Sequence, residues 1–328
     1  MTNLDDRLRE AAASLEPNEA PIPPFKGVQQ RARRRRVMGA AGAVVVLVAV
    51  TFAAVSTTRD HDRVIVATPR STSTTVAPST TTTTSTPKAP VTFHELNVYL
   101  IANEHVVTAR RETTGAATPE NAVRALLTGP AGATERDLGF TTAIPAGTLL
   151  HSVTVDGPVA TVDLSQQFES GGGSLSMQAR VAQVVFTVTQ FAGIDHVRFR
   201  IDGTPVSTIG GEGLMVDNVG RADFANVTPL ILVESPTPGA TVGTPLNVRG
   251  MSNTFEAGIN YTLYDSTGAV LVEGYTTATA GTGTWGTFDF DVAYTVPRAE
   301  PGRLTVYELS AKDGSRVHET SVPLQLQP

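Results

Sequence analysis

The sequence contains no cysteine among its 328 residues, and this absence removes several kinds of chemistry. Disulfides, thiolate metal sites, cysteine nucleophiles and lipids attached through cysteine are all excluded. Lysine is also scarce, since Lys26, Lys88 and Lys312 are the only lysines among 25 basic residues. Aromatic residues make up 6% of the chain, with Trp285 as the single tryptophan. The length is that of about two domains of ~150 residues each.

The charge of the chain is distributed unevenly. Residues 91–328 carry 13 basic and 24 acidic side chains, a net charge of −11, whereas the whole chain has −6. Residues 1–36 are net +3 and residues 56–90 are net +2. Because nucleic-acid binding needs clustered Lys and Arg to neutralise phosphates, the acidic C-terminal part predicts no nucleic-acid partner.

An uncharged stretch of 19 residues runs from Val37 to Val55. A run of this length predicts a transmembrane helix at residues 37–55 that contacts the lipid bilayer. Five arginines lie just before it, at positions 31 and 33–36, so the positive-inside rule predicts a cytoplasmic N-terminus and extracellular C-terminal domains. The alternative is a cleaved signal peptide ending near Ala54-Val55-Ser56, although such apolar runs are usually ~7–15 residues long.

The segments on either side of this stretch have little capacity to form a core. In the cytoplasmic tail, residues 1–36, Leu4, Leu8, Ala12 and Leu15 have helical spacing, and this short helix either docks on a cytosolic partner or is disordered. Residues 56–90 form a predicted linker, in which Ser or Thr fills 13 of the 17 positions from 71 to 87. We expect this low-complexity linker to hold the folded domains away from the membrane.

Helix and strand patterns alternate between residues 91 and 228. Strands are expected at residues 96–101 and 197–201, and at 149–155 and 159–164 on either side of an Asp156-Gly157 turn. One helix is expected to begin at Pro119 and end before Gly129-Pro130. A second begins near Ser174, with apolar residues at helical spacing through Phe191. This order predicts an α+β domain in which a mixed sheet carries two helices.

The helical signal disappears after residue 229. Seven strands are expected at residues 231–234, 246–249, 259–264, 270–273, 287–294, 304–309 and 321–326. Within one of them, Phe288, Phe290 and Val292 alternate with Asp289 and Asp291, the pattern of a half-buried strand. About seven short strands without helices predict an all-β immunoglobulin-like sandwich at residues 229–328.

Two ordered sets of short motifs resemble known families. Leu126-Leu-Thr-Gly-Pro130, Ile144-Pro-Ala-Gly-Thr148, Ala160-Thr-Val-Asp-Leu-Ser165 and Ile201-Asp-Gly203 resemble the GerMN domain of sporulation and spore germination. Ser235-Pro236, Pro238-Gly239, Asn253-Thr-Phe-Glu256, Gly286-Thr-Phe288 and Asp313-Gly314 are similar to the immunoglobulin-like domain of bacterial spore germination. The resemblance implies cell-envelope modules outside the membrane, in families without an established enzymatic activity. Many relatives are lipoproteins, whereas this chain has no cysteine to which a lipid could be attached.

Motifs for catalysis or cofactor binding are scarce. No two of the six histidines have metal-ligand spacing, so no metal, cofactor or catalytic residue is predicted. Gly281, Gly283 and Gly286 fit a dinucleotide-binding motif literally, but the expected strand after them favours a turn. The candidate interaction surface consists of Asn253, Phe255, Glu256 and Trp285. For Phe255 the alternative is a buried strand residue beside turn-capping neighbours, and for Trp285 it is a place in the core.

The sequence therefore favours a non-enzymatic protein that binds other envelope proteins through its GerMN-like and immunoglobulin-like domains. The alternative function is binding of peptidoglycan or another wall glycan, which needs exposed aromatic platforms. An enzyme is the least favoured class, since it needs a polar cleft with convergent titratable groups.

Overall fold

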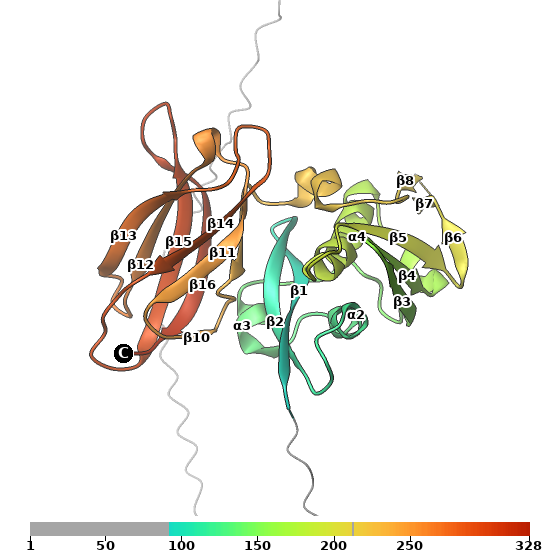
Figure 1. Ribbon diagram of the computed structural model, residues 1–328, viewed down its shortest axis with the longest axis horizontal. Helices are drawn as coiled ribbons and strands as arrows, with labels where there is room; N and C mark the ends of the chain where they lie inside the picture. Colours follow the sequence, from blue (N-terminus) through green and yellow to red (C-terminus); the bar gives the residue numbers. More distant parts are fainter. Residues whose placement is uncertain (1–91, 212) are drawn as a thin grey trace, which may run out of the picture. The chain divides into compact units, whose positions relative to one another are not determined.

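The computed structural model describes residues 92–211 and 213–328, and its elements form two regions (Figure 1). We call residues 94–227 the α+β region and residues 231–326 the β-sandwich region. The cytoplasmic tail, the transmembrane helix at 37–55 and the linker at 56–90 lie outside the described residues and stay predictions. Among the helices of residues 92–211 and 213–328, none has the length and apolarity needed to cross a bilayer.

The α+β region contains three α-helices, eight strands and two 3₁₀ helices within the described residues. In chain order they are β1 (His94–Ala102), β2 (His105–Thr113), α2 (Pro119–Leu127), α3 (Gly132–Asp137), β3 (Leu150–Asp156), β4 (Val159–Leu164), η1 (Gln166–Glu169), α4 (Ser174–Val188), β5 (His196–Ile201), β6 (Thr204–Val206), β7 (Thr208–Ile209), β8 (Leu214–Met215) and η2 (Arg221–Val227).

The predicted mixed sheet is present, but it does not include the first predicted strand. Its four strands have the order β3-β4-β5-β6, with β4 and β5 parallel and the other pairs antiparallel. The strand predicted at residues 96–101 is β1, which instead forms a separate hairpin with β2, a strand that the sequence analysis missed. The expectation of one sheet carrying every strand is therefore wrong for β1.

Helix α4 explains why β1 stays outside that sheet. Its side chains bond the backbone of β1 where another strand would otherwise pair. Gln190, just past the helix, accepts from the Asn97 amide at 2.8 Å and donates to the Asn97 carbonyl at 2.7 Å. Thr187 Oγ1 accepts from the Tyr99 amide at 3.1 Å, and Gln183 Nε2 donates to the Tyr99 carbonyl at 3.0 Å. Because these backbone groups are satisfied by side chains, the edge of β1 is closed to a further strand.

Both predicted helices are confirmed, for physical reasons visible in the sequence. Thr118 caps α2, since its hydroxyl accepts from the Asn121 amide at 3.2 Å, and Pro119 occupies the first turn, where its missing N–H costs nothing. Helix α4 is buried on more than its apolar face, because Arg180 and Gln183 are buried as well. Arg180 donates to the carbonyls of Ala143, Phe168 and Gly171.

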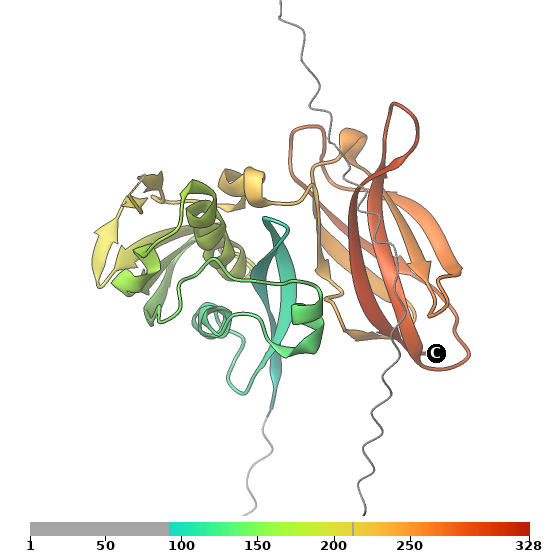
Figure 2. The same cartoon turned by 180° about the vertical axis from the view of Figure 1, so that it is seen from behind.

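The β-sandwich region has eight strands, among them the seven predicted ones (Figure 2). They are β9 (Ile231–Ser235), β10 (Thr241–Val242), β11 (Leu246–Ser252), β12 (Gly258–Tyr264), β13 (Val270–Thr277), β14 (Gly286–Val292), β15 (Glu300–Leu309) and β16 (Arg316–Leu326), with the short η3 (Phe255–Ala257) before β12. The added strand, β10, is two residues long and pairs in parallel with β16.

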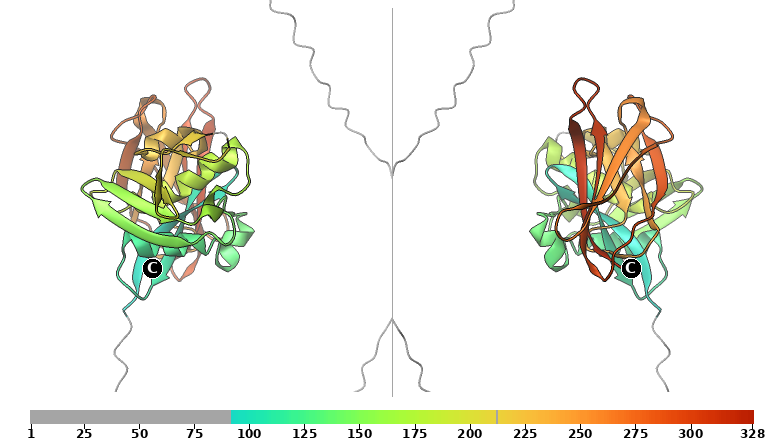
Figure 3. Two further views of the ribbon diagram at one scale, coloured as in Figure 1. Left: turned by 90° about the vertical axis from the view of Figure 1, so that its right-hand side faces the viewer. Right: turned by 90° about the vertical axis from the view of Figure 1, so that its left-hand side faces the viewer.

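Two sheets of this region pack around one apolar core (Figure 3). One sheet has the order β10-β16-β15-β12-β13 and the other the order β14-β11-β9. Val248 and Phe288 from the smaller sheet and Ile259, Leu263 and Leu304 from the larger one are buried in the same cluster. The alternation predicted in β14 is confirmed, because Phe288 and Val292 are buried and Asp289 and Asp291 are exposed.

Candidate functional site

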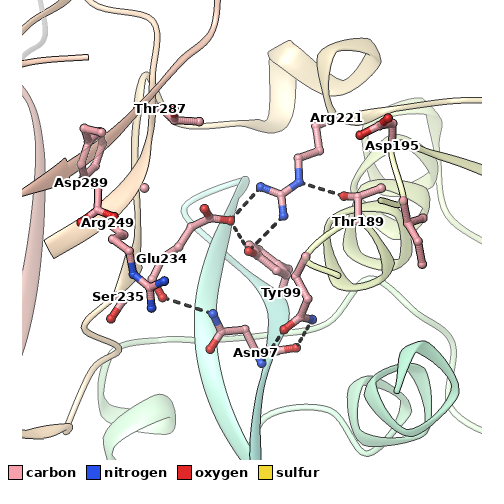
Figure 4. Close-up of a pocket in the computed structure, with 14 residues that line it drawn as sticks. Asn97, Tyr99, Thr189, Asp195, Arg221, Glu234, Ser235, Arg249, Thr287 and Asp289 are labelled. Atoms are coloured by element: carbon pink, nitrogen blue, oxygen red, sulfur yellow. Dashed lines mark hydrogen bonds and ion pairs between the residues drawn. The ribbon is translucent and has the colours of Figure 1, made fainter. Parts of the chain in front are cut away.

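A partly buried polar network joins the two regions. Tyr99 of β1 donates its hydroxyl hydrogen to a carboxylate oxygen of Glu234 on β9. Arg221, the first residue of η2, donates to the same Glu234 oxygen at 2.7 Å and to the Tyr99 hydroxyl at 3.3 Å. Figure 4 shows the three side chains pointing toward one another. Three elements far apart in the sequence thus meet at one carboxylate.

The arginine of this network is held on all sides. Its Nε donates to Thr189 Oγ1 at 2.8 Å, and another nitrogen donates to the Phe186 carbonyl at 3.3 Å. The guanidinium carbon also lies 4.8 Å from the centre of the Phe186 ring and 5.3 Å from that of Tyr99, within the range of cation–π attraction. Arg221 is therefore positioned by the α+β region to meet a carboxylate from the β-sandwich region.

The network shifts the titration of its members. Burial, and then the negative charge of Glu234, raises the pKa of the Tyr99 phenol far above its usual range. Burial alone lowers the pKa of the Arg221 guanidinium, but Tyr99 and Glu234 more than offset this, so the pKa is raised. Tyr99 is therefore a neutral hydrogen-bond donor and Arg221 a fixed cation at neutral pH. The arrangement suits a structural ion pair bridging two regions.

An apolar contact accompanies the polar one. Leu232 of β9 and Met251 of β11 are 2% and 7% exposed, and both belong to the core cluster of the α+β region rather than to that of the sandwich. Trp285 packs against the same cluster. One further bond crosses nearby, from Asn97 Nδ2 to the Glu234 carbonyl at 3.2 Å. Residues 94–227 and 231–326 therefore share buried apolar and polar groups.

A cleft of 640 Å³ opens beside this network (Figure 4). Its walls come from β1, from the segment after α4, and from β9, β11 and β14 of the β-sandwich region. The polar residues that line it are Asn97, Tyr99, Thr189, Gln190, Asp195, Arg221, Glu234, Ser235, Arg249, Thr287 and Asp289. Ligand sites often lie in clefts between packed units, so this cleft is the first candidate for a binding site.

The structure brings the four residues of the predicted interaction surface to neighbouring loops. Asn253 Oδ1 accepts from the Gly283 amide at 2.8 Å, and Glu256 donates its amide hydrogen to Thr282 Oγ1 at 2.9 Å. Phe255 is 52% exposed, so its predicted alternative as a buried strand residue is not what the structure has. Trp285, on the second loop, is partly buried against the core of the α+β region. Only Phe255 and Glu256 of the four are exposed, and whether they bind a partner stays a prediction.

A second exposed aromatic side chain lies near the backbone of the Phe255 loop. Tyr275 of β13 is 62% exposed. Gly258 lies between the Phe255 backbone and the Tyr275 ring, because a Cβ placed on it would lie 3.5 Å from the Phe255 carbonyl oxygen and 3.5 Å from the Tyr275 ring. The Phe255 amide is fixed by Glu308, whose other carboxylate oxygen lies 2.8 Å from His318 Nδ1. This end of the sandwich therefore presents aromatic surface on a hydrogen-bonded loop.

Sequence reasoning missed the residues of the junction. Tyr99 stands in an apolar strand segment and looks like a core residue, and Arg221 lies in a segment without clear periodicity. Only Glu234 could have been noticed in the sequence, as a charged residue that directly follows the apolar residues Ile231, Leu232 and Val233 of one strand. The dinucleotide motif is a turn as predicted, because β14 begins at its last glycine, Gly286. Across residues 92–211 and 213–328, no group of three or more His, Asp and Glu side chains is placed to hold a metal ion.

Comparison with known families gives one match in each of the two regions. Residues 97–207 match a family model described as "Sporulation and spore germination". Residues 230–315 match one described as "Immunoglobulin-like domain of bacterial spore germination". No curated protein matches the chain. Two segments thus match models of sporulation and spore-germination domains, in agreement with the resemblance seen in the sequence.

The comparison with solved structures gives matches at low identity and low TM-score. The tandem GerMN domains of the sporulation protein GerM from Bacillus subtilis are 21% identical over 72% of this chain, with a TM-score of 0.36. The chain spans 61% of the length of that structure. The first GerMN domain of the same protein is 26% identical over 39% of this chain and 98% of its own, with a TM-score of 0.31. CopC from Methylosinus trichosporium OB3b is 18% identical over 30% of this chain and 94% of its own, with a TM-score of 0.22.

Proposed function

We propose that this chain is a membrane-tethered envelope protein whose C-terminal part, outside the cell, binds other proteins in a sporulation- or germination-related or other envelope assembly. The apolar stretch at 37–55 anchors it, with the N-terminus in the cytoplasm, and the linker at 56–90 sets its reach. The two matches to spore-germination domain models support this assignment. Non-catalytic binding agrees with the roles of Tyr99, Arg221 and Glu234, because these three side chains pair with and hydrogen-bond one another.

The observation that carries the proposal is the junction. A partly buried ion pair and a shared apolar cluster hold two modules together. Interactions that fix two modules in one arrangement lower the ordering cost when a partner binds across both. A pair of modules that bound independent partners would have no need of Arg221, which reaches out of the α+β region to Glu234.

Site-specific photo-crosslinking in intact cells tests the proposal on the full chain. A photoreactive phenylalanine analogue replaces Phe255, which is 52% exposed, and in a matched control it replaces Thr204, an exposed residue on β6 of the α+β region. We expect a discrete crosslinked protein from position 255 that is absent at position 204. The same products from both positions, or none from either, would contradict a specific partner at this surface.

A second candidate function is binding of wall glycan, favoured by two exposed aromatic side chains, Phe255 and Tyr275, at this end of the sandwich. Aromatic faces of this kind form platforms for flat apolar surfaces. Retention of the full chain on purified cell wall separates this candidate from the first. We expect Phe255→Ala with Tyr275→Ala to abolish retention if the platform binds glycan. Retention that the double substitution leaves intact would remove this candidate.

A further inference from the structure

The cleft at the junction continues into a second one, and together they form a groove. The neighbouring cavity has a volume of 530 Å³ and shares Asn97, Gln190, Glu234, Ser235 and Arg249 with the first. It extends along the start of β1 and along the segment that joins β9 to β11. Each cavity alone lies within the usual range of about 300–1,000 Å³ for small-molecule sites. Their continuity suits an elongated occupant rather than a compact one.

Most charges in the groove are already neutralised by a neighbour. Glu234 pairs with Arg221 at 2.7 Å, and Arg110 pairs with Glu95 at 2.9 Å. Arg249 is different, because it is exposed and has no ion pair or hydrogen bond of its side chain among residues 92–211 and 213–328. It lies in both cavities, on β11, and Figure 4 shows its side chain reaching into the cleft. Its guanidinium is thus available for a bidentate bond to a carboxylate.

Besides apolar residues such as Leu96, Pro236 and Leu246, the groove contains short polar side chains. Asn97 and Asn247 each use the amide nitrogen, on the Glu234 carbonyl and on Asp289 and Asp291, and neither amide oxygen has a partner within the described residues. The Ser235 hydroxyl, in both cavities, likewise has none there. Acceptors and a hydroxyl along an elongated groove suit the N–H and C=O groups of an extended peptide.

We propose that this groove binds an extended peptide segment of a partner protein, with one carboxylate of that segment held by Arg249. The inference rests on the proposed function and names the site and the chemistry of its partner. Asp195 and Asp289 line the first cavity, so an acidic run is disfavoured, and a single Asp or Glu with a Lys or Arg nearby is favoured. A glycan is disfavoured, because the aromatic residues of the cleft, Tyr99 and Phe288, are 0% and 4% exposed and offer no stacking face.

Selection from a displayed library of random 12-residue peptides tests this site on the full chain. The wild type is compared with Arg249→Glu and with Arg298→Glu, a matched change at an exposed arginine that lines neither cavity. We expect the wild type and Arg298→Glu to enrich peptides with one acidic and one basic residue. Arg249→Glu should bind those peptides at least about tenfold more weakly, as expected for the loss of a charge-assisted hydrogen bond. Arg249→Gln, which removes the charge without reversing it, should show a smaller loss.

Three outcomes would overturn the proposal: no enriched peptide, equal binding by Arg249→Glu, or equal losses from Arg249→Glu and Arg298→Glu. Retention on purified wall that Arg249→Glu abolishes would replace the peptide by a glycan. Crosslinks at position 255 in cells without peptide selection would remove the groove site and leave the proposed function standing. Peptide selection without those crosslinks would support the groove site and contradict the partner at the Phe255 surface. The failure of one proposal can therefore be told from the failure of the other.

The absence of native cysteine permits a direct check of location. Ser235→Cys places a single thiol in the groove, and Thr204→Cys places one on an exposed strand outside it. We expect a selected peptide to slow maleimide labelling at position 235 and to leave position 204 unchanged. Equal protection of both thiols, or of neither, would show that the peptide binds elsewhere.

Discussion

The two regions of this molecule bury their polar groups in different ways. In the α+β region, Arg180, Gln183 and Thr187 of one helix are buried, and each bonds backbone groups of a neighbouring segment. In the β-sandwich region, the cluster between the sheets consists of aliphatic and aromatic side chains, and the buried polar residues are the short hydroxyl side chains of Thr and Ser together with Glu308. Hydrophobic alternation is thus the clearest pattern in the sandwich, whereas long polar side chains of one helix that bond backbone groups distinguish the α+β region. The junction resembles the α+β region in this respect, because Tyr99, Arg221 and Glu234 bond one another there.

The first test of this comparison, with the largest expected loss of stability, is a substitution inside the sandwich, at Gly250. A Cβ on this residue would lie 2.1 Å from the Leu232 carbonyl oxygen and 2.6 Å from the Phe288 ring. We expect Gly250→Ala to lower the free energy of unfolding by about 3 kcal/mol, since strands β9 and β11 must separate to admit it. Gly243→Ala is the control, because nothing lies within 4 Å of its Cβ. Chemical denaturation of both variants measures the difference, and equal stabilities would show that this packing is not tight.

The junction should be nearly as sensitive. Glu234→Ala leaves Arg221 and Tyr99 without their shared acceptor, and the Arg221 and Glu234 side chains are 20% and 23% exposed. We expect a loss of about 2–3 kcal/mol in the free energy of unfolding, below the range for fully buried pairs. The control is Glu120→Ala, which breaks an exposed pair with Arg124 on α2 and should cost about 0.5 kcal/mol or less. Similar losses in the two variants would mean that the junction is only a surface contact.

A smaller effect is expected from the polar helix face that closes the edge of β1. Gln183 is 0% exposed, donates to the Tyr99 carbonyl and accepts from the Ala143 amide at 2.8 Å. Gln183→Leu removes these two bonds and the one that Gln183 accepts from Thr142 Oγ1 at 3.2 Å, so we expect a loss of about 2 kcal/mol. Amide hydrogen exchange should also show weaker protection of Ala143. An unchanged stability would indicate that an apolar residue serves this position equally well.

The tyrosine of the junction predicts a pH dependence. Because burial and Glu234 raise the pKa of Tyr99, the folded state keeps the phenol proton at a pH where the unfolded state, with a pKa near 10, loses it. The stabilisation is complete below pH ~10 and falls by about 1 kcal/mol per pH unit above it. Burial also raises the pKa of Tyr294, so the comparison with Tyr99→Phe isolates the junction. Parallel stability curves for the wild type and Tyr99→Phe between pH 9 and 12 would contradict this assignment.

The smallest effect is expected at the exposed loop. Phe255→Ala removes a half-exposed ring, so the free energy of unfolding should change by less than about 0.5 kcal/mol. The same substitution should reduce retention on purified cell wall if the loop binds glycan. A loss of several kcal/mol would instead assign Phe255 to the fold, and its value as an interaction probe would be lost.

The same contrast explains which parts of the fold were predictable from the sequence. Every predicted strand of the sandwich is present, because alternating residues such as Phe288 and Asp289 report burial directly. The pairing of β1 was not predictable in this way, because its edge is closed by Gln183 and Gln190, whose amides carry no periodic signal. The pairing of Arg221 with Glu234 was not predictable either, because an ion pair between residues 13 positions apart depends on the tertiary fold.

The exposed loops were the part of the site that composition alone could indicate. Phe255 beside Asn253 and Glu256 marked an aromatic residue in polar surroundings, and the structure leaves that ring exposed. The groove was not visible in the sequence, because Asn97 and Arg249 become neighbours of one cavity only after β1 and β11 are brought together. Sites built from two regions in this way depend on the junction that joins those regions.

Equilibrium unfolding of the full chain followed by two probes tests most directly whether the regions act as one unit. Trp285, the single tryptophan, reports on the β-sandwich region where it touches the core of the α+β region, and far-UV circular dichroism reports on helix α4. The account predicts that the two denaturation curves coincide in the wild type and separate in Glu234→Ala, because the shared network couples the regions. Separate midpoints in the wild type, or coincident curves in Glu234→Ala, would contradict the role assigned to Tyr99, Arg221 and Glu234.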